Sequence, residues 1–472
     1  MPQSTVQLSN TKAEQGIYPA YQKFVVSLDN IQGMYFQSVN VGCVTPENRK
    51  YLLEVSINGT VVVTLKAPPN EYDRANFQLE KIFQDYLSTD ITPFFLDGTN
   101  TEKDAIHNIT TVNQNKSTLI QVDLRGGEEY EINGVLSTIL RDATEQTHAT
   151  GIDKKFFVYN GTRQHVDGND ASFILEHQCN SNTGKLLTDA LSTFSTFANL
   201  DDVTTDAQLQ KIRTNDYACI AAFNRDHHTH QNVWTRVQYS LFDSNENLIV
   251  IVNEDNNHED LANAFGMTQR TGLVWVPAGM QNLRDMAITS TANLDNTAFY
   301  SISLENDSNI PLSQSYYYKV IDDDCKGFET LRLAWVNSFG TWDYYNFNKK
   351  STQSFNSKRS TYEQQYGYRQ DSDTYGYSYS ENTGGTQVLT NTVKETIEAN
   401  TDFITEQEAD FLKHCFTSPN VQMQVGTGNT AEWVGVVITE SEYIKQTSAN
   451  DKVIQYIITV EKSHNYRVQR EG

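Results

Sequence analysis

The chain has 472 residues, of which 36 are Lys or Arg and 59 are Asp or Glu, so its formal net charge is -23. This charge disfavours binding to duplex DNA through phosphate neutralisation, and it would repel anionic membrane surfaces. Aromatic residues reach 11% while charged residues are only 20%, which excludes an intrinsically disordered chain. No apolar run is long enough to predict a transmembrane helix, and the first five residues lack the features of a signal peptide, so we expect neither.

The first predicted element is a β-hairpin. Residues 51–57 and 60–65 are rich in β-branched and apolar side chains, and Asn58-Gly59 joins them. Asn-Gly is the strongest short hairpin signal because both turn positions need a positive φ. We therefore expect an N-terminal β-layer built around this pair.

A helix and a second hairpin are predicted next. Asp73 can cap a helix whose apolar face follows i, i+3, i+4 spacing, formed by Phe77, Leu79, Ile82, Phe83, Tyr86 and Leu87. Further along, residues 120–124 and 129–132 read as strands, and Gly126-Gly127 between them predicts a hairpin turn.

Short strands separated by turn residues dominate the remainder. They are expected at residues 24–28, 34–39, 155–159, 172–175, 233–242, 248–252, 300–304, 316–321, 331–335, 433–438 and 453–460. Strands of this length and spacing favour β-sandwich domains.

The C-terminal third contains one strong helix signal. After a segment rich in Ser, Thr and Tyr, residues 349–385, Thr405 and Glu408 have the spacing of a capping box. The helix is expected to end at Ser418-Pro419 and to bury Phe411, Leu412, Cys415 and Phe416.

The fold class expected from these elements is mainly β, with several β-sandwich-like domains and a few short amphipathic helices. The length predicts about two to four domains. The expected divisions are a β-domain with one helix at 1–95, a hairpin extension at 96–150, middle sandwich domains at 151–347, a Tyr/Ser/Thr-rich connector at 348–400, and a small α+β module at 401–472.

One histidine cluster is the best candidate for a metal site. In His227–His230, His228 and His230 would share a face of a strand and could ligate one ion together, for instance on a trimer axis. Asp226 and Gln231 flank the cluster and favour a polar turn instead. We therefore expect no metal there.

A second string has the spacing of a calcium loop. Asp243, Asn245, Asn247 and Glu254 occupy loop positions 1, 3, 5 and 12, but Leu248 stands where the sharp turn needs glycine. A polar hairpin turn is the favoured interpretation.

No pattern predicts catalysis or a cofactor. Phosphate-binding, dinucleotide-binding, zinc-protease and serine-hydrolase motifs are absent from the sequence. A glycosidase pair could be hidden among Glu254, Asp255, Glu259 and Asp260, but a solvated acidic face is the ordinary explanation for these residues. Five scattered cysteines read as buried, reduced residues: Cys43, Cys179, Cys219, Cys325 and Cys415. We expect no catalytic, cofactor-binding or metal-binding residue and hence no enzyme.

The most unusual string is residues 332–347, which together with Leu331 are called the tryptophan hairpin below. It reads as two strands joined by a tight turn, in which Gly340 supplies a positive φ and Asn337 bridges backbone groups. Its aromatic residues are expected to alternate into the core. The residues assigned a structural role are Trp335, Asn337, Gly340, Trp342, Asp343 and Phe347.

This string resembles a motif of tailed-bacteriophage structural proteins, especially tail-tip or baseplate components. Two further strings occur in the order that the resemblance implies. Residues 276–283 resemble the family's Gly-Pro-x-Asn-Leu turn, with Met280 in place of the proline. Residues 416–421 resemble the start of its C-terminal module, and Ser338 stands where a basic residue is common.

The resemblance implies a virion protein with no catalytic residues, which builds a tail, baseplate, neck or adaptor by binding other virion proteins. It implies synthesis in the host bacterial cytoplasm and a homo-oligomer within a symmetric assembly, with no sequence-specific nucleic acid and no membrane insertion. One alternative is a tail-borne receptor- or carbohydrate-binding module that uses the tyrosines at positions 362, 366, 368, 375, 377 and 379 for stacking. A polysaccharide-degrading enzyme with an unmarked carboxylate pair is a weaker alternative.

Overall fold

The computed structural model describes most of the strands of this chain. The described residues are 17–21, 24–29, 47–72, 74–88, 107–108, 118–132, 134–140, 153–162, 179, 183–191, 209–224, 234–256, 273–321, 329–364, 368–369, 377–378, 384–427, 431–439, 454–464 and 466. Strands far outnumber helices, and four sheets contain three or more strands. The predicted mainly β class is confirmed, while the pairing of sheets into sandwiches stays a prediction.

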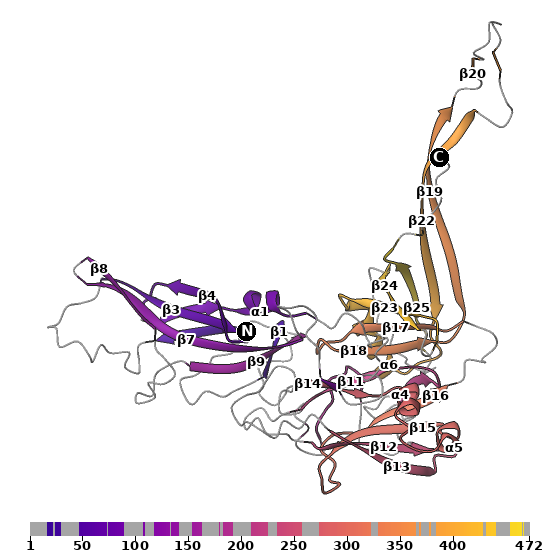
Figure 1. Cartoon of the computed structure of the whole chain (residues 1–472), viewed down its shortest axis with the longest axis horizontal. Helices are drawn as coiled ribbons and strands as arrows, with labels where there is room; N and C mark the ends of the chain where they lie inside the picture. Colours follow the sequence, from indigo (N-terminus) through magenta and orange to yellow (C-terminus); the bar gives the residue numbers. More distant parts are fainter. Residues whose placement is uncertain are drawn as a thin grey trace.

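The N-terminal sheet has the order β1-β9-β7-β3-β4, with β8 pairing to β7. Asn58 and Gly59 have φ angles of 54° and 79°, so the predicted hairpin turn between β3 and β4 is confirmed. The helix α1 and the pair β2–β5 cover one apolar side of this sheet (Figure 1). The strands and the helix are β1 (Ile17–Tyr21), β2 (Val25–Asp29), β3 (Glu47–Ile57), β4 (Thr60–Ala67), β5 (Arg74–Gln78), α1 (Glu80–Tyr86), β7 (Leu119–Ile132), β8 (Val135–Leu140) and β9 (Asp153–Thr162).

Two predictions in this region are wrong in detail. The helix begins only at Glu80, because residues 74–78 form the strand β5 and pair with β2. Gly126-Gly127 makes no turn, since β7 runs straight through both glycines and pairs with β3 there. The chain turns instead before β8, where Gly134 has a φ of 78°.

The middle region contains a five-stranded sheet and a three-stranded sheet. The first has the order β10-β16-β15-β12-β13 and the second β11-β14-β6. Their interface is one apolar cluster that also takes in the short helices α4 and α5. The elements are β6 (His107–Asn108), β10 (Leu209–Arg213), β11 (Cys219–Phe223), β12 (Arg236–Phe242), β13 (Leu248–Asp255), β14 (Leu273–Pro277), α4 (Met280–Asp285), α5 (Thr291–Asp295), β15 (Phe299–Glu305) and β16 (Tyr316–Ile321).

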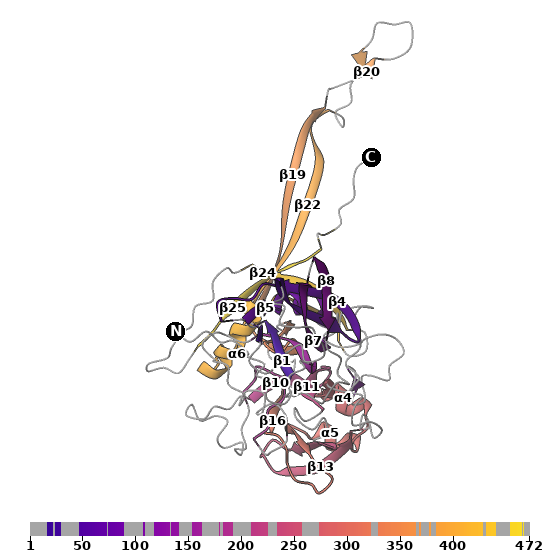
Figure 2. The same ribbon diagram turned by 90° about the vertical axis from the view of Figure 1, so that its left-hand side faces the viewer.

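The C-terminal region is a seven-stranded sheet of order β18-β17-β23-β24-β25-β22-β19. Because β17 pairs with β23, this sheet crosses the domain divisions expected after residues 347 and 400. Two strands of this sheet, β19 and β22, continue far beyond the body as a two-stranded arm (Figures 1 and 2). The elements are β17 (Leu331–Val336), β18 (Trp342–Phe347), β19 (Ser351–Gln364), β20 (Tyr368–Arg369), β21 (Tyr377–Ser378), β22 (Gly385–Asn400), α6 (Glu406–Thr417), β23 (Val421–Val425), β24 (Glu432–Ile438) and β25 (Ile457–Lys462).

Helix α6 packs against this sheet and largely follows its prediction. The Thr405 hydroxyl accepts a hydrogen bond from the Glu408 backbone N–H, and the helix ends before Ser418 as expected. The Glu408 carboxylate does not turn back to complete the box. It accepts hydrogen bonds from Tyr345 at 2.7 Å and from Lys211 at 3.2 Å, which joins the helix to β18 and β10.

Candidate functional site

The tryptophan hairpin lies where the three regions meet. Strands β17 and β18 pair in register from Leu331↔Phe347 to Val336↔Trp342. In the turn, Asn337 Oδ1 accepts hydrogen bonds from the backbone N–H groups of Phe339 and Thr341, both at 3.0 Å. Asn337 therefore has the bridging role expected from the sequence.

The hairpin is buried on both faces, which corrects the expectation of a single core. Trp335 and Phe347 belong to the C-terminal core, where the Trp335 ring lies 5.0 Å from that of Phe411 on α6. Trp342 faces the opposite way, into a cluster shared with Tyr159 of β9. The aromatic residues of this hairpin thus stabilise two cores at once.

The turn docks on the N-terminal sheet through its glycine. Gly340 has a φ of 72°, as predicted, and a Cβ at this position would overlap the backbone carbonyl of Asn160. Beside it, the Thr162 N–H donates to the Ser338 carbonyl at 2.6 Å. Only glycine allows both this conformation and this close approach.

Residues 186–190 form hydrogen bonds with the hairpin from the other side. Sequence analysis did not single out this segment. The Leu187 carbonyl accepts hydrogen bonds from Asn337 Nδ2 at 3.1 Å and from Thr341 Oγ1 at 2.7 Å. Asp189 Oδ2 accepts from the Ser338 N–H at 2.9 Å, and the hydroxyl of Ser338 also donates to Asp189. This segment has no recognisable motif, so its role becomes visible only in three dimensions.

A buried ion pair connects the hairpin to the middle region. Arg332, which is 1% exposed, donates to the Asp216 carboxylate and, at 2.7 Å, to the Tyr217 carbonyl. Asp216 also accepts from Arg213 at 3.1 Å and from Asn346 at 2.9 Å. Burial opposes ionisation of Asp216, but attraction to the two arginines outweighs it and lowers the pKa of that carboxyl. Arg332 interrupts the apolar run of β17. Because a buried charge needs an opposite charge, this arginine was the signal in the sequence that an acidic partner exists.

The second string, residues 276–283, contacts the loop that contains Asp216 and Tyr217. Asn282 Oδ1 accepts hydrogen bonds from the N–H groups of Gly279 and Ala218, both at 3.0 Å, at the start of α4. A Cβ on Gly279 would overlap the backbone of Asp216 and Ala218, so the turn and the loop are in direct contact.

The third string adds the C-terminal strand. The Ser418 hydroxyl donates to the Val336 carbonyl at 2.9 Å, and Val421 of β23 then pairs with Trp335. All three strings therefore contribute, through hydrogen bonds and packing, to one junction around the tryptophan hairpin.

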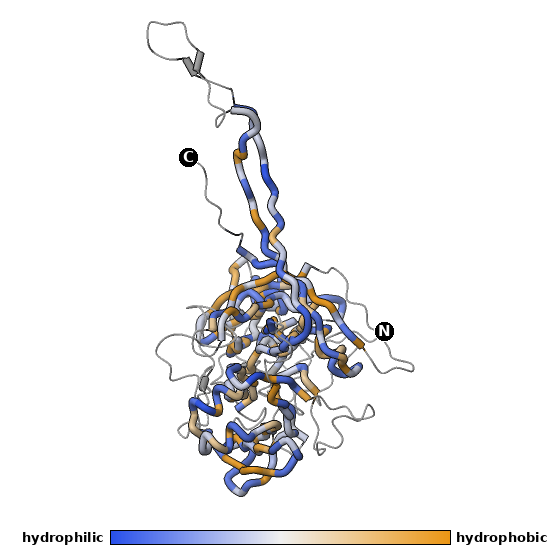
Figure 3. Tube along the Cα trace, turned by 90° about the vertical axis from the view of Figure 1, so that its right-hand side faces the viewer, coloured by the Kyte–Doolittle hydropathy of each residue, from blue (hydrophilic) through white to orange (hydrophobic). Residues whose placement is uncertain are grey.

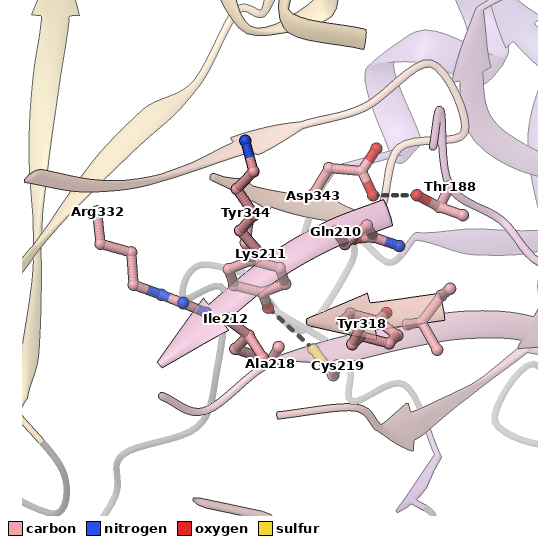
Figure 4. A pocket seen from close by; sticks show the side chains of 11 residues that line it. Thr188, Gln210, Lys211, Ile212, Ala218, Cys219, Tyr318, Arg332, Asp343 and Tyr344 are labelled. Carbon is pink, nitrogen blue, oxygen red and sulfur yellow. Dashed lines mark hydrogen bonds between the residues drawn. The ribbon is translucent and has the colours of Figure 1, made fainter. Parts of the chain in front are cut away.

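A small cavity lies within this junction (Figure 4). Its volume is about 20 Å³, and Arg332, Asp343, Tyr344 and Cys219 are among the residues that line it. In the same view Tyr344 Oη and Cys219 Sγ are 3.1 Å apart. A cavity of this size holds about one water molecule, whereas ligand pockets typically have about 300–1,000 Å³. This cavity is therefore not a substrate pocket.

The calcium-like string forms a polar turn. Asp243 Oδ1 accepts hydrogen bonds from the N–H groups of Asn245 and Asn247 at 2.8 and 2.9 Å, so the carboxylate is used within the turn. Leu248 begins β13, and Glu254 lies near its end. The predicted hairpin turn is confirmed.

Other sequence candidates lie partly outside the described residues. His227–His230, Glu259 and Asp260 fall there, as do Cys43 and Cys325. Cys179, Cys219 and Cys415 are buried, as expected. Among the described residues, no group of three or more His, Cys, Asp or Glu could hold a metal ion, and no helix is long and apolar enough to cross a membrane.

Asp343, the one acidic residue of the hairpin, has a strongly raised pKa. It accepts hydrogen bonds from Thr188 Oγ1 at 2.5 Å and from the Asp189 N–H at 2.9 Å. Burial, and after it the nearby Asp189 carboxylate, raises the pKa of Asp343 from 3.8 to about 7. His414 of α6 lies on the far side of Asp189, with 3.3 Å between Nδ1 and Oδ2.

We expect the junction to lose stability as pH rises towards neutrality. A raised native pKa means that the folded protein binds a proton more tightly, so the stabilisation is complete below pH 3.8 and is lost as pH rises through about 7. Asn at this position imitates the protonated acid. The melting temperatures of wild type and Asp343→Asn should therefore be similar at acid pH, and wild type should melt lower at alkaline pH. Parallel melting curves across this range would contradict the assignment.

Comparison of the chain with models of known protein families and with curated proteins finds no match. The function is therefore argued from the geometry and from the resemblance of the three strings.

Proposed function

We infer that the function of this chain resides in the arm formed by β19 and β22. The two strands pair antiparallel from Ser351↔Ala399 to Gln364↔Gly385. Strand β25 flanks β22 only at residues 396–400, so the outer part of the arm is a two-stranded ribbon. Every residue of β19 after Ser351 is exposed. In Figure 3 most of this ribbon has the colours of hydrophilic residues, with few hydrophobic positions between them.

An extended ribbon of this kind has little core of its own. Two-stranded hairpins are at best marginally stable in water, and they gain stability from further strands or from a packed face. Among the described residues, the arm contacts the body near its base, for example by the Lys394–Glu461 ion pair at 2.6 Å and by the contact of Phe355 with Tyr466. Its outer part is suited to contacts with another molecule.

We propose that this chain is a structural component of a tailed-phage virion that builds the tail, baseplate or a neck adaptor through protein–protein contacts. The observation that carries the proposal is the exposed arm on a body whose regions are tightly joined. The resemblance of the three strings supports it, because the residues of these strings make contacts between the regions of the chain. A net charge of -23 would also keep such a subunit from adhering to passing DNA.

The carbohydrate-binding alternative depends on the six tyrosines between residues 362 and 379. Of the six named for it, only Tyr362 has a described side chain, which is 43% exposed on the arm. The described residues therefore give no observation that favours carbohydrate binding over assembly.

The proposal is tested by shortening the arm. Deletion of residues 357–393, with Asn356 and Lys394 joined through Asn-Gly, uses two residues that already face each other across the ribbon. The body should keep its melting temperature, because its cores lie outside the deleted segment. The amount of this chain in purified particles should fall to background in a phage that supplies only the shortened form.

The unaltered chain, supplied from the same plasmid, is the control for expression and for particle yield. Antibody labelling in electron micrographs should place it at the tail or neck. Normal incorporation of the shortened chain would show that assembly does not require the arm. Absence of the unaltered chain from purified particles would overturn the proposed function as a whole.

A further inference from the structure

Strand β19 is an open sheet edge. It is the last strand of the seven-stranded sheet, and among the described residues no strand pairs with its outer side. It has 14 residues and contains no proline. Its outward N–H and C=O groups can therefore form a further ladder, which is the usual way in which an edge strand binds a partner.

The arm is electrically neutral on a strongly acidic chain. Strand β19 contains Lys358, Arg359 and Glu363, and β22 contains one lysine and two glutamates, so three positive charges balance three negative ones. Two copies of a chain with a net charge of -23 repel each other. The arm reaches away from the body, so it is where two copies can approach each other with least repulsion (Figure 2).

The charges of the outer half of β19 are unpaired within the described chain. Arg359 lies opposite Asn391, and Glu363 lies opposite Thr386, so neither has an opposite charge across the ribbon. The ladder shifts register between Ser360 and Thr361, where β22 has one extra residue, Leu389. Because the extra residue is on β22, β19 keeps its alternation, which places Arg359, Thr361 and Glu363 on one face of the arm. Both charged side chains remain available to a partner.

This spacing is self-complementary. If β19 of one copy pairs antiparallel with β19 of another, centred on Thr361, then Arg359 lies opposite Glu363 of the second copy. The two-fold symmetry repeats this charge pair on the other side of the centre. Lys358 then lies opposite a neutral residue, Gln364, and no like charges meet. Opposite charges directly across an antiparallel ladder stabilise it, and like charges destabilise it.

We propose that two copies of this chain associate through their arms, in an antiparallel β19–β19 pairing centred on Thr361. The result is a four-stranded ribbon with an isologous two-fold interface. Four strands also remove the marginal stability of the isolated arm. This inference rests on the proposed assembly function and names the partner of the arm as a second copy of the same chain.

Cross-linking of the purified full chain tests the register. Thr361→Cys places the new thiol opposite its own symmetry mate, so mild oxidation should give a covalent dimer on a non-reducing gel. Thr352→Cys is the matched control, because in this register the two copies of residue 352 lie far apart. The unaltered chain controls for its own cysteines. Equal cross-linking of both variants, or none with Thr361→Cys, overturns the register.

Charge reversal tests the chemistry. Arg359→Glu or Glu363→Arg alone brings like charges together twice, and each should raise the dimer dissociation constant by about tenfold in analytical ultracentrifugation. The double variant Arg359→Glu/Glu363→Arg restores both pairs and should recover the affinity of the unaltered chain. A chain that stays monomeric at all concentrations would overturn the pairing. It would mean that these charges prevent association at the sheet edge. A chain that enters particles yet shows neither the cross-link nor this charge dependence refutes the pairing and leaves the proposed function intact.

Discussion

Replacement of Trp342 by alanine is expected to destabilise the protein by about 3–5 kcal/mol, the usual cost of removing a buried aromatic side chain. Trp342 is 1% exposed and lies in a cluster with Phe157 and Tyr159 of the N-terminal sheet and Trp275 of β14. A cavity there would loosen the contact between the two regions. The loss is a large part of the roughly 5–15 kcal/mol by which domains are stable. Thermal melting and soluble yield measure it, and under the proposed virion function particles should be incomplete.

The matched control is an aromatic residue that contributes little to a core. Phe403 is 66% exposed. Phe403→Ala should change the stability by no more than about 0.5 kcal/mol, because surface substitutions away from special features have small effects. If Trp342→Ala folds and assembles normally but its particles no longer adsorb to host cells, Trp342 is a binding contact and not a structural residue.

The sequence was most informative where a residue type has a local backbone requirement. Asn58-Gly59 and Gly340 adopt the positive φ angles expected of them, and Thr405 caps the helix that it was expected to cap. Each of these predictions depends on the conformational preference of one or two residues. Such preferences act within a few positions and survive in any tertiary context that allows the turn.

Local signals failed where long-range pairing outweighed them. Gly126-Gly127 favours a turn in isolation, yet both glycines lie in β7 and pair with Leu52 and Leu53 of β3. Residues 74–78 fit a helical period, but their pairing with β2 makes them a strand. Strand formation depends on neighbours that are distant in sequence, so a local pattern cannot decide it.

The junction was found only in part for the same reason. The aromatic residues and the turn of the hairpin stand out in the sequence, but their polar partners do not. Asp216 lies 116 positions from Arg332, and Thr188 lies 155 positions from Asp343. Neither partner belongs to a motif, because one correctly placed carboxylate or hydroxyl is enough to satisfy a buried polar group.

Replacement of Gly340 by alanine is expected to disrupt the docking of the hairpin on the N-terminal sheet. A non-glycine residue at a φ of 72° is strained, and such strain typically costs about 1–3 kcal/mol. The added Cβ would also overlap the Asn160 carbonyl, which belongs to the backbone and cannot rotate away as a side chain would. The turn must therefore withdraw from β9 and weaken the hydrogen bond between Thr162 and Ser338.

Gly59 separates these two effects. Its φ of 79° matches that of Gly340, but a Cβ there would meet no atom within 4 Å. Gly59→Ala should therefore cost only the backbone strain, about 1–2 kcal/mol. Gly340→Ala should lower the melting temperature further and speed protease cleavage near the N-terminal sheet, because the regions come apart. Equal melting temperatures for the two variants would mean that the turn does not hold the regions together. A larger loss at Gly340 would show that its contact with Asn160 joins the N-terminal sheet to the rest of the protein.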